Sequence, residues 1–198
     1  FNQKVFAAAV PIFRQYTAAM SNNTANTTYA DALNRIGDCL FQARDFQQAS
    51  DVYHQVAELK SNGADYAILQ QGYAQGLLHH YAEKAAVLTS LIEQYPRSDY
   101  ADDAMYEIAR AQLQQNKNED AIHTYQQLLK KYPNSNQAPK SSLESGMTYR
   151  TTKQYDQAIY SFKSTIEQYA GTEEAYAALE GLEQVYVETN KIDEYIAY

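Results

Sequence analysis

The chain has 198 residues, a length that suits one or two domains with a hydrophobic core. Its 16 lysine and arginine residues and 24 aspartate and glutamate residues give a net charge of -8. Because the basic residues are also scattered along the sequence, we expect no nucleic-acid partner. The longest apolar run, residues 5–13, is interrupted by Pro11 and is too short to cross a bilayer, so we expect no transmembrane segment.

The composition favours helices. Only 7 glycines and 4 prolines occur beside many alanine, glutamine, leucine and glutamate residues, and strand-like alternation is absent. The 19 tyrosines each combine a large apolar ring with a polar hydroxyl. Such side chains suit helix–helix interfaces whose periphery is accessible to solvent. These features predict an all-α protein.

The predicted helices follow an internal repeat that begins near the N-terminal end. A large apolar residue is followed three positions later by a small residue and seven positions later by another large apolar residue, as in Phe6, Ala9 and Phe13. Related patterns start at residues 46, 81, 118, 155 and 192, and the last three steps are 37 residues each. We interpret each start as the opening of the second helix of a two-helix repeat.

A first helix is predicted before each of these second helices. In one repeat the first helix includes residues 104–113, and the polar segment 114–118 joins it to the second helix. Two second helices are predicted to end at Tyr-Pro steps, at Pro96 and Pro133, because proline cannot continue a helix. The sequence therefore predicts a stack of antiparallel helix pairs.

Small residues recur where these helices are expected to cross. They lie nine positions before most of the starts, with Glu183 as the exception, and are Gly37, Gly72, Ala109 and Gly146. Two helix backbones approach closely only where a glycine or alanine lies at the contact, and a large neighbour then fills the space beside it. We expect Ala121 and Ala158, in the second helices, to tolerate no larger side chain.

This arrangement resembles the tetratricopeptide repeat family, whose helix-turn-helix unit has small residues at its eighth and twentieth positions and an aromatic residue at the twenty-fourth. The matching residues form three sets along the chain. They are Gly37, Ala49 and Tyr53; Ala109, Ala121, Tyr125 and Pro133; and Gly146, Tyr149, Ala158 and Phe162. The resemblance implies an all-α, right-handed superhelical solenoid of antiparallel helix pairs.

The sequence departs from the family pattern in three ways. The early tryptophan of the family is absent, Lys84 replaces a small residue, and the step of 37 residues exceeds the usual 34. The extra residues fall in Tyr-Pro-x-Ser turns at residues 95–98 and 132–135. These turns are similar to those of bacterial envelope members, such as the Tol-Pal-associated periplasmic protein and the outer-membrane-assembly lipoproteins.

The register predicts how the repeats divide the chain. Residues 1–20 are predicted to be the second helix of a truncated preceding repeat, followed by a polar loop at residues 21–28. Residues 29–198 then hold about four full repeats and a partial terminal one. We expect the whole chain to be one solenoid cut from a longer protein, which leaves self-association through exposed end helices open.

The sequence contains no recognisable catalytic or cofactor-binding motif. Adjacent histidines such as His79 and His80 diverge around a helix, so they do not suit a shared metal ion. Cys39 follows Gly37 in a predicted first helix, which favours a buried, unreactive thiol. We therefore predict no enzyme activity, no cofactor and no metal site.

The resemblance also implies a binding surface, because in tetratricopeptide arrays the first helices line a concave groove. When the groove positions of the family are transferred to this sequence, nine residues are expected to line the groove. They are Asn34, Asp38, Leu69, Tyr73, Tyr106, Arg110, Leu143, Met147 and Arg150. A peptide with apolar anchors and an acidic group near Arg110 or Arg150 would suit this set. Because Asp38 follows Asn34, the lysine and asparagine clamp for a terminal carboxylate is not reproduced.

The sequence therefore predicts a non-enzymatic scaffold that binds a protein or peptide partner in a bacterial envelope complex. The expected location is periplasmic or associated with the outer membrane, and a cytoplasmic location is the alternative. A purely architectural spacer within a larger protein remains the alternative function.

Overall fold

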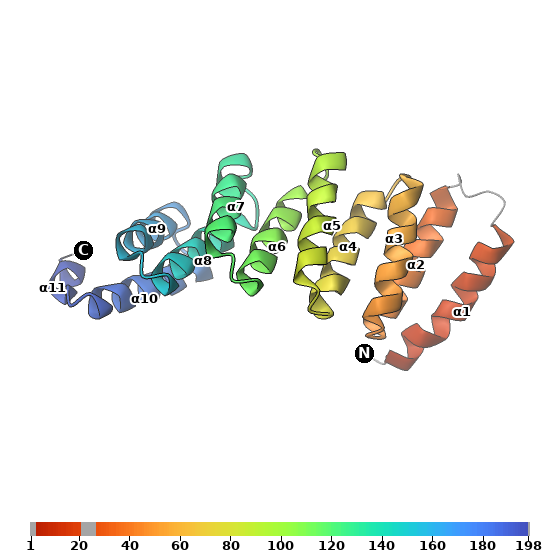
Figure 1. The fold of residues 1–198 in the computed structure, drawn as a ribbon, viewed down its shortest axis with the longest axis horizontal. Helices are drawn as coiled ribbons and strands as arrows, with labels where there is room; N and C mark the ends of the chain where they lie inside the picture. Colours follow the sequence, from red (N-terminus) through yellow and green to blue (C-terminus); the bar gives the residue numbers. More distant parts are fainter. Residues whose placement is uncertain (1–2, 21–26, 198) are drawn as a thin grey trace. The chain divides into compact units, whose positions relative to one another are not determined.

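The computed structural model describes residues 3–20 and 27–197, and within these ranges it contains eleven α-helices and no strand (Figure 1). The helices are α1 Gln3–Ala19, α2 Thr27–Gln42, α3 Phe46–Leu59, α4 Ala64–Leu77, α5 Tyr81–Gln94, α6 Ala101–Gln114, α7 Asn118–Lys131, α8 Ala138–Thr151, α9 Tyr155–Gln168, α10 Glu173–Glu188 and α11 Ile192–Ile196. The predicted all-α fold is confirmed.

The sequence repeat predicts the first residue of five second helices correctly, whereas the start at Phe6 is wrong, since α1 already begins at Gln3. Starts predicted at residues 46, 81, 118, 155 and 192 are the first residues of α3, α5, α7, α9 and α11. The predicted loop at residues 21–28 is only partly testable, because residues 21–26 lie outside the described residues. Its last two residues, Thr27 and Thr28, were assigned wrongly, since they belong to α2.

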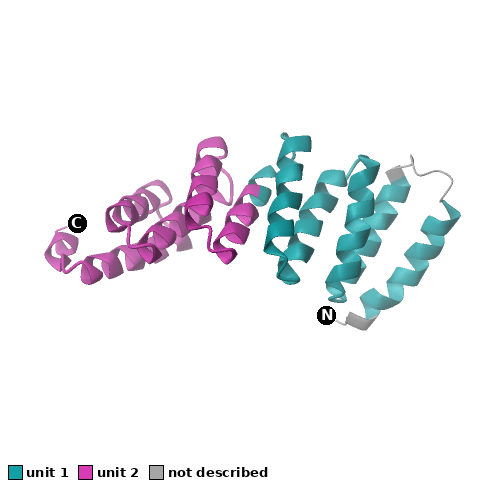
Figure 2. Ribbon diagram, in the orientation of Figure 1, with its two compact units in different colours: residues 1–104 teal, residues 105–198 magenta. Residues whose placement is uncertain are grey.

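The chain forms two compact units, unit 1 (Phe1–Ala104) and unit 2 (Met105–Tyr198), with the division inside α6 (Figure 2). In unit 1 each helix from α1 to α5 packs against the next one along the chain, and α2 also contacts α4. In unit 2 the same holds from α7 to α11, and α8 also contacts α10. We call α2, α4, α6, α8 and α10 the first helices, and the others the second helices.

The small residues of the repeat lie where a first helix crosses a second helix. A Cβ atom added to Gly37 of α2 would lie 2.5 Å from the Tyr53 ring of α3, and one added to Gly146 of α8 would lie 2.7 Å from the Phe162 ring of α9. Ala109 lies in the same cluster as Tyr125. The predicted close approach of the helix backbones is thus present in both units.

Phe162 fills the centre of the core in unit 2. Its ring is fully buried, and Cβ atoms added to Gly146 of α8 and to Gly181 of α10 would lie 2.7 Å and 2.6 Å from it. Gly181 thus packs against the second helix of the preceding repeat, while Glu183, where the pattern would place a small residue, is exposed. Ala158, Ala178 and other buried residues complete this cluster.

The turn between the first and second helix of a repeat has the same backbone geometry at five places. Each turn has a non-glycine residue with a positive φ, two positions before the second helix begins. These residues are Arg44 (66°), His79 (62°), Asn116 (59°), Lys153 (61°) and Asn190 (58°). In every case two N–H groups donate back to the end of the first helix, as in a Schellman motif.

Lys153 shows this hydrogen bonding. Its N–H donates to the carbonyl oxygen of Arg150 at 2.9 Å, and the N–H of Gln154 donates to that of Tyr149 at 2.8 Å. The left-handed conformation costs a residue with a Cβ atom about 1–2 kcal/mol, a cost that glycine avoids. At Lys153 the geometry is thus imposed by the packing of the repeat and not by a residue that favours it.

We expect Lys153→Gly to stabilise the protein. The gain in the free energy of unfolding should be about 0.5–1 kcal/mol, because the relieved steric cost exceeds the extra entropy that glycine gives the unfolded chain. Chemical denaturation followed by circular dichroism measures it. Lys153→Ala is the matched control, since it removes the exposed side chain but keeps the Cβ atom, and it should give no gain. Equal stabilisation by both substitutions would contradict this explanation.

Candidate functional site

In unit 1, the surface of the first helices contains a cavity of about 320 Å³, which we call the Asp38 pocket. Its walls come from α2, from the start of α4 and from the segment before α6. The lining residues are Asp31, Asn34, Arg35, Asp38, Gly63, Tyr66 and Tyr100. Two residues of the predicted groove, Asn34 and Asp38, therefore meet in one cavity.

Asp38 is held in place by two tyrosines. Its Oδ1 atom accepts a hydrogen bond from the Tyr53 hydroxyl at 2.8 Å and another from the Tyr66 hydroxyl at 2.7 Å. Burial and the neighbouring Asp38 carboxylate raise the pKa of both tyrosines above the usual value, so both hydroxyls stay protonated as donors. The carboxylate thus has a fixed orientation inside the pocket.

The other polar side chains of the pocket are less completely paired. Asn34 is nine-tenths buried and donates from Nδ2 to the carbonyl oxygen of Gly63 at 3.3 Å, while its Oδ1 has no hydrogen-bond partner among the residues described. Arg35 approaches Asp31 at 3.7 Å and Oδ2 of Asp38 at 3.5 Å, and its side chain is 59% exposed. Ion pairs this long and exposed hold a side chain only weakly.

In unit 2, the predicted residues Tyr106 and Arg110 lie together on α6. The Arg110 guanidinium lies 5.8 Å from the centre of the Tyr106 ring and donates to Glu107 at 3.1 Å. Glu144 of α8 belongs to the same electrostatic environment, where burial raises the pKa of its carboxyl group and the charge of Arg110 opposes that shift. Arg110 therefore already has acidic neighbours.

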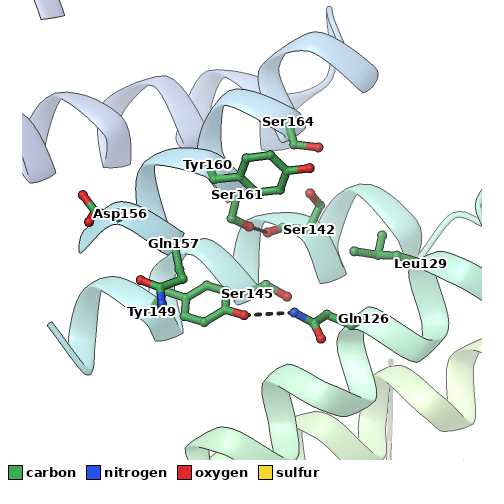
Figure 3. Close-up of a pocket in the computed structure, with 10 residues that line it drawn as sticks. All are labelled: Gln126, Leu129, Ser142, Ser145, Tyr149, Asp156, Gln157, Tyr160, Ser161 and Ser164. Atoms are coloured by element: carbon green, nitrogen blue, oxygen red, sulfur yellow. Dashed lines mark hydrogen bonds between the residues drawn. The ribbon is translucent and has the colours of Figure 1, made fainter. Parts of the chain in front are cut away.

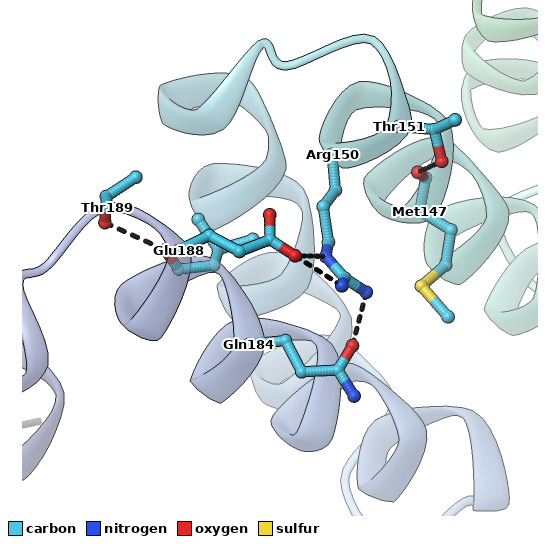
Figure 4. A network of polar contacts seen from close by, with 7 residues as sticks. Met147, Arg150, Thr151, Gln184, Glu188 and Thr189 are labelled. Atoms are coloured by element: carbon cyan, nitrogen blue, oxygen red, sulfur yellow. Dashed lines mark hydrogen bonds and ion pairs between the residues drawn. The ribbon is translucent and has the colours of Figure 1, made fainter.

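Arg150 joins α8 to α10 on the same surface of unit 2 (Figure 4). Its Nε donates to Glu188 at 3.0 Å, its NH2 group also reaches Glu188, at 2.5 Å, and its NH1 group donates to Gln184. A cavity of about 490 Å³ lies beside this contact, lined by Arg150, Glu180, Glu183, Gln184, Val187 and Glu188. The predicted acidic group of a partner would have to compete with Glu188 for Arg150.

Burial corrects part of the predicted groove. Leu69 is only 3% exposed and lies in the core, so it offers no contact surface to a partner. Tyr73 and Leu143 are half-buried, whereas Met147 is 38% exposed. The position of a residue in the repeat predicts the helix face on which its side chain lies. The packing of neighbouring helices determines whether that side chain is exposed to solvent.

Sequence reasoning missed other residues of these cavities. Asp31 and Arg35 lie one helical turn before Asn34 and Asp38, so helix periodicity could have found them. Tyr66 lies six positions before Gly72, as Asp31 lies six positions before Gly37, so the same register could have found it, whereas Tyr100 comes from the segment before α6, outside the first helices. The sequence gives no signal that their rings lie 5.9 Å apart.

A third cavity, of about 350 Å³, lies between the second helices α7 and α9, with α8 behind it (Figure 3). Leu129, Tyr149 and Tyr160 contribute apolar surface, and serines form much of the remainder. Ser161 donates to the carbonyl oxygen of Ser142 at 3.0 Å, and the Tyr149 hydroxyl accepts from Gln126 at 2.9 Å. The hydroxyl groups of Ser161 and Tyr149 therefore already have hydrogen-bond partners within the protein.

The histidines and the cysteine are candidate metal ligands or nucleophiles within residues 3–20 and 27–197. No group of three or more histidine, cysteine, aspartate or glutamate residues in the described part of the chain could hold a metal ion. His79 and His80 make separate contacts, to Tyr81 and to Gln75. Burial and the charge of Asp38 raise the pKa of the half-buried Cys39 thiol, which disfavours the reactive thiolate.

Three segments of the chain match the family model of the tetratricopeptide repeat: residues 66–98, 103–135 and 141–172. They correspond to the helix pairs α4–α5, α6–α7 and α8–α9. No curated protein matches the sequence. None of the helices between residues 3–20 and 27–197 is both long and apolar enough to pass through a bilayer.

Solved structures of other proteins share this fold. BtubC from P. vanneervenii is 11% identical with a TM-score of 0.71, and the match covers 98% of this chain and 85% of that one. MamA is 20% identical with a TM-score of 0.68, over 82% and 90% of the two chains. YrrB, a tetratricopeptide repeat protein with an unusual peptide-binding site, is 16% identical with a TM-score of 0.66, over 92% and 87%. At these identities the likeness supports the fold alone, an all-α helical solenoid.

Proposed function

We propose that this chain, which carries three successive tetratricopeptide repeats, is a non-enzymatic scaffold that binds a partner protein or peptide along the surface of its first helices. The observation that carries the proposal is the position of the cavities. In each unit, first helices line a cavity that contains residues of the predicted groove, Asn34 and Asp38 in unit 1 and Arg150 in unit 2.

The types of side chain on this surface support the proposal. Tyrosine, arginine and methionine are enriched at the centres of protein interfaces, and Tyr106, Arg110, Met147 and Arg150 are all at least partly exposed. The fold is typical of interaction scaffolds, and the similar protein YrrB has a peptide-binding site. The absence of a recognisable catalytic motif in the sequence agrees with a binding role.

We expect the triple variant Arg110→Ala, Met147→Ala and Arg150→Ala to reduce recovery of the partner at least about tenfold. Truncation of arginine anchors at an interface commonly costs about 1–2 kcal/mol or more, and 1.4 kcal/mol corresponds to a factor of ten. Affinity capture from the source cells with quantitative mass spectrometry measures the change. Circular dichroism should show unchanged helicity, because Arg110 and Met147 project from the surface.

The matched control changes exposed residues of the second helices. Lys130→Ala with Tyr160→Ala alters α7 and α9, where Tyr160 is 78% exposed, and partner recovery should remain at the level of the unmodified protein. Equal recovery with the control and the triple variant would reject the first-helix surface. An architectural spacer would then be the better description.

We also propose that the partner complex lies in the bacterial cell envelope. The support is the Tyr-Pro-x-Ser turn at residues 95–98 and again at 132–135, which resembles turns of envelope members of the family. In spheroplasts of the source bacterium, added protease should degrade the native protein while a cytoplasmic marker survives. Protection of the protein until the cells are lysed would place it in the cytoplasm instead.

A further inference from the structure

We propose that the Asp38 pocket binds the cationic side chain of a lysine or arginine in a partner peptide. The inference rests on the proposed scaffold function and adds the chemistry of the partner. A cavity of about 320 Å³ lies at the lower end of the volumes of ligand pockets, which run from about 300 to 1,000 Å³. Its size therefore suits one long side chain and not a whole folded segment.

The charges of the lining favour a basic guest. Two carboxylates, Asp31 and Asp38, face one guanidinium, that of Arg35, and the whole chain carries a net charge of -8. Arg35 makes only contacts of 3.5 and 3.7 Å to these carboxylates, and its side chain is mostly exposed. A cation from a partner can therefore displace it at low cost and take its place between the two carboxylates.

The Asp38 carboxylate is preorganised to accept a hydrogen bond from a cationic side chain. The hydroxyls of Tyr53 and Tyr66 both donate to Oδ1, whereas Oδ2 faces Arg35 at 3.5 Å. The carboxylate therefore keeps one oxygen for an incoming N–H donor and need not reorient when the guest binds. Preorganisation of this kind lowers the entropic cost of binding.

Two further features fit a cation with N–H donors. The rings of Tyr66 and Tyr100 lie 5.9 Å apart with 56° between their planes, and both line the pocket, where their faces attract positive charge. The Oδ1 atom of the buried Asn34 has no partner among the described residues, and a buried acceptor without a donor is costly. The ammonium of lysine and the guanidinium of arginine supply only donors.

The test uses three blocked pentapeptides with the sequence Gly-Ser-X-Ser-Gly, where X is lysine, norleucine or glutamate. Each is titrated at constant ionic strength into the full isotope-labelled chain, and amide shifts are followed by NMR. We expect saturable shifts at Asn34, Asp38, Gly63 and Tyr66 with the lysine peptide only. Norleucine keeps the apolar stem without the charge, so it separates cation recognition from simple filling of the cavity.

Charge variants give the decisive comparison. Arg35→Ala should tighten binding of the lysine peptide about two- to fivefold, because it removes the competing cation, and Asp31→Asn should weaken binding by a similar factor. Lys130→Ala is the matched control, since it removes one positive charge from exposed α7 and should leave the affinity unchanged. Both Asp31 and Arg35 have largely exposed side chains, so neither change should disturb folding.

Three outcomes would overturn the proposal. A preference for the glutamate peptide would identify the pocket as an anion site, and weaker lysine binding in Arg35→Ala would contradict the displacement of Arg35 by the bound cation. Absence of saturable shifts with the lysine peptide would show that the pocket does not bind cations. Each result leaves the scaffold function intact if the Arg110, Met147 and Arg150 variant still loses its partner, so the two proposals fail separately.

Discussion

Phe162→Ala is expected to lower the free energy of unfolding by about 3–5 kcal/mol, the range for a buried phenylalanine cut back to alanine. The ring is fully buried and is enclosed by α8, α9 and α10. Two residues that lie close to the ring, Gly146 and Gly181, have no side chains that could move into the vacated space. The cavity should therefore persist, which places the cost toward the upper part of this range.

Urea denaturation followed by circular dichroism measures this loss. Tyr160→Ala is the control on the same helix, since Tyr160 is 78% exposed, and it should change stability by no more than about 0.5 kcal/mol. A loss below about 1 kcal/mol for Phe162→Ala would mean that unit 2 closes around the missing ring, contrary to this description of its core.

The second large effect is expected from Gly146→Ala, which should cost about 1–3 kcal/mol through overpacking. Alanine normally favours a helix over glycine by about 1 kcal/mol, so the sign of the change is itself informative. The new Cβ atom would lie 2.7 Å from two carbons of the Phe162 ring, which is also in close contact with the backbone at Gly181 of α10. The helix backbones must therefore separate.

Gly76→Ala provides the comparison for this prediction. Its added Cβ atom would meet the flexible end of Lys84, at 3.1 Å from Cδ, so we expect a neutral or stabilising change. Combining Gly146→Ala with Phe162→Leu should cost less than the sum of the two single changes, because the smaller side chain makes room. Strict additivity, or stabilisation by Gly146→Ala alone, would contradict the proposed contact.

The helix pairs could be predicted from the sequence because the fold repeats the same contact. Tyr53, Tyr125 and Phe162 occupy equivalent positions opposite Gly37, Ala109 and Gly146, so one physical requirement appears three times in the sequence. The turn geometry could not be predicted in this way. Arg44 and Lys153 are not residues that favour a positive φ, and tertiary packing imposes that conformation on them.

The binding surface was predicted less completely than the fold. Asn34 and Asp38 were found because their positions on α2 follow from the register, and they line the Asp38 pocket. Tyr66 and Tyr100 reach the same cavity from other segments, and Leu69 is buried in the core whereas Tyr106 and Leu143, at equivalent register positions, are half-buried. Such differences arise from contacts between helices, which a register taken from one sequence does not specify.

The five turns with a positive φ also bear on how far this protein could be made thermostable. Their side chains are exposed, and the turns are separated from one another by whole helices, so their individual contributions should add. Glycine at Arg44 and Lys153 should yield about 0.5–1 kcal/mol each, and less at His79, Asn116 and Asn190, which tolerate a positive φ better. None of the five residues lines a cavity described above. Glycine substitutions in the turns should thus raise the stability of the protein without changing the residues proposed to bind a partner.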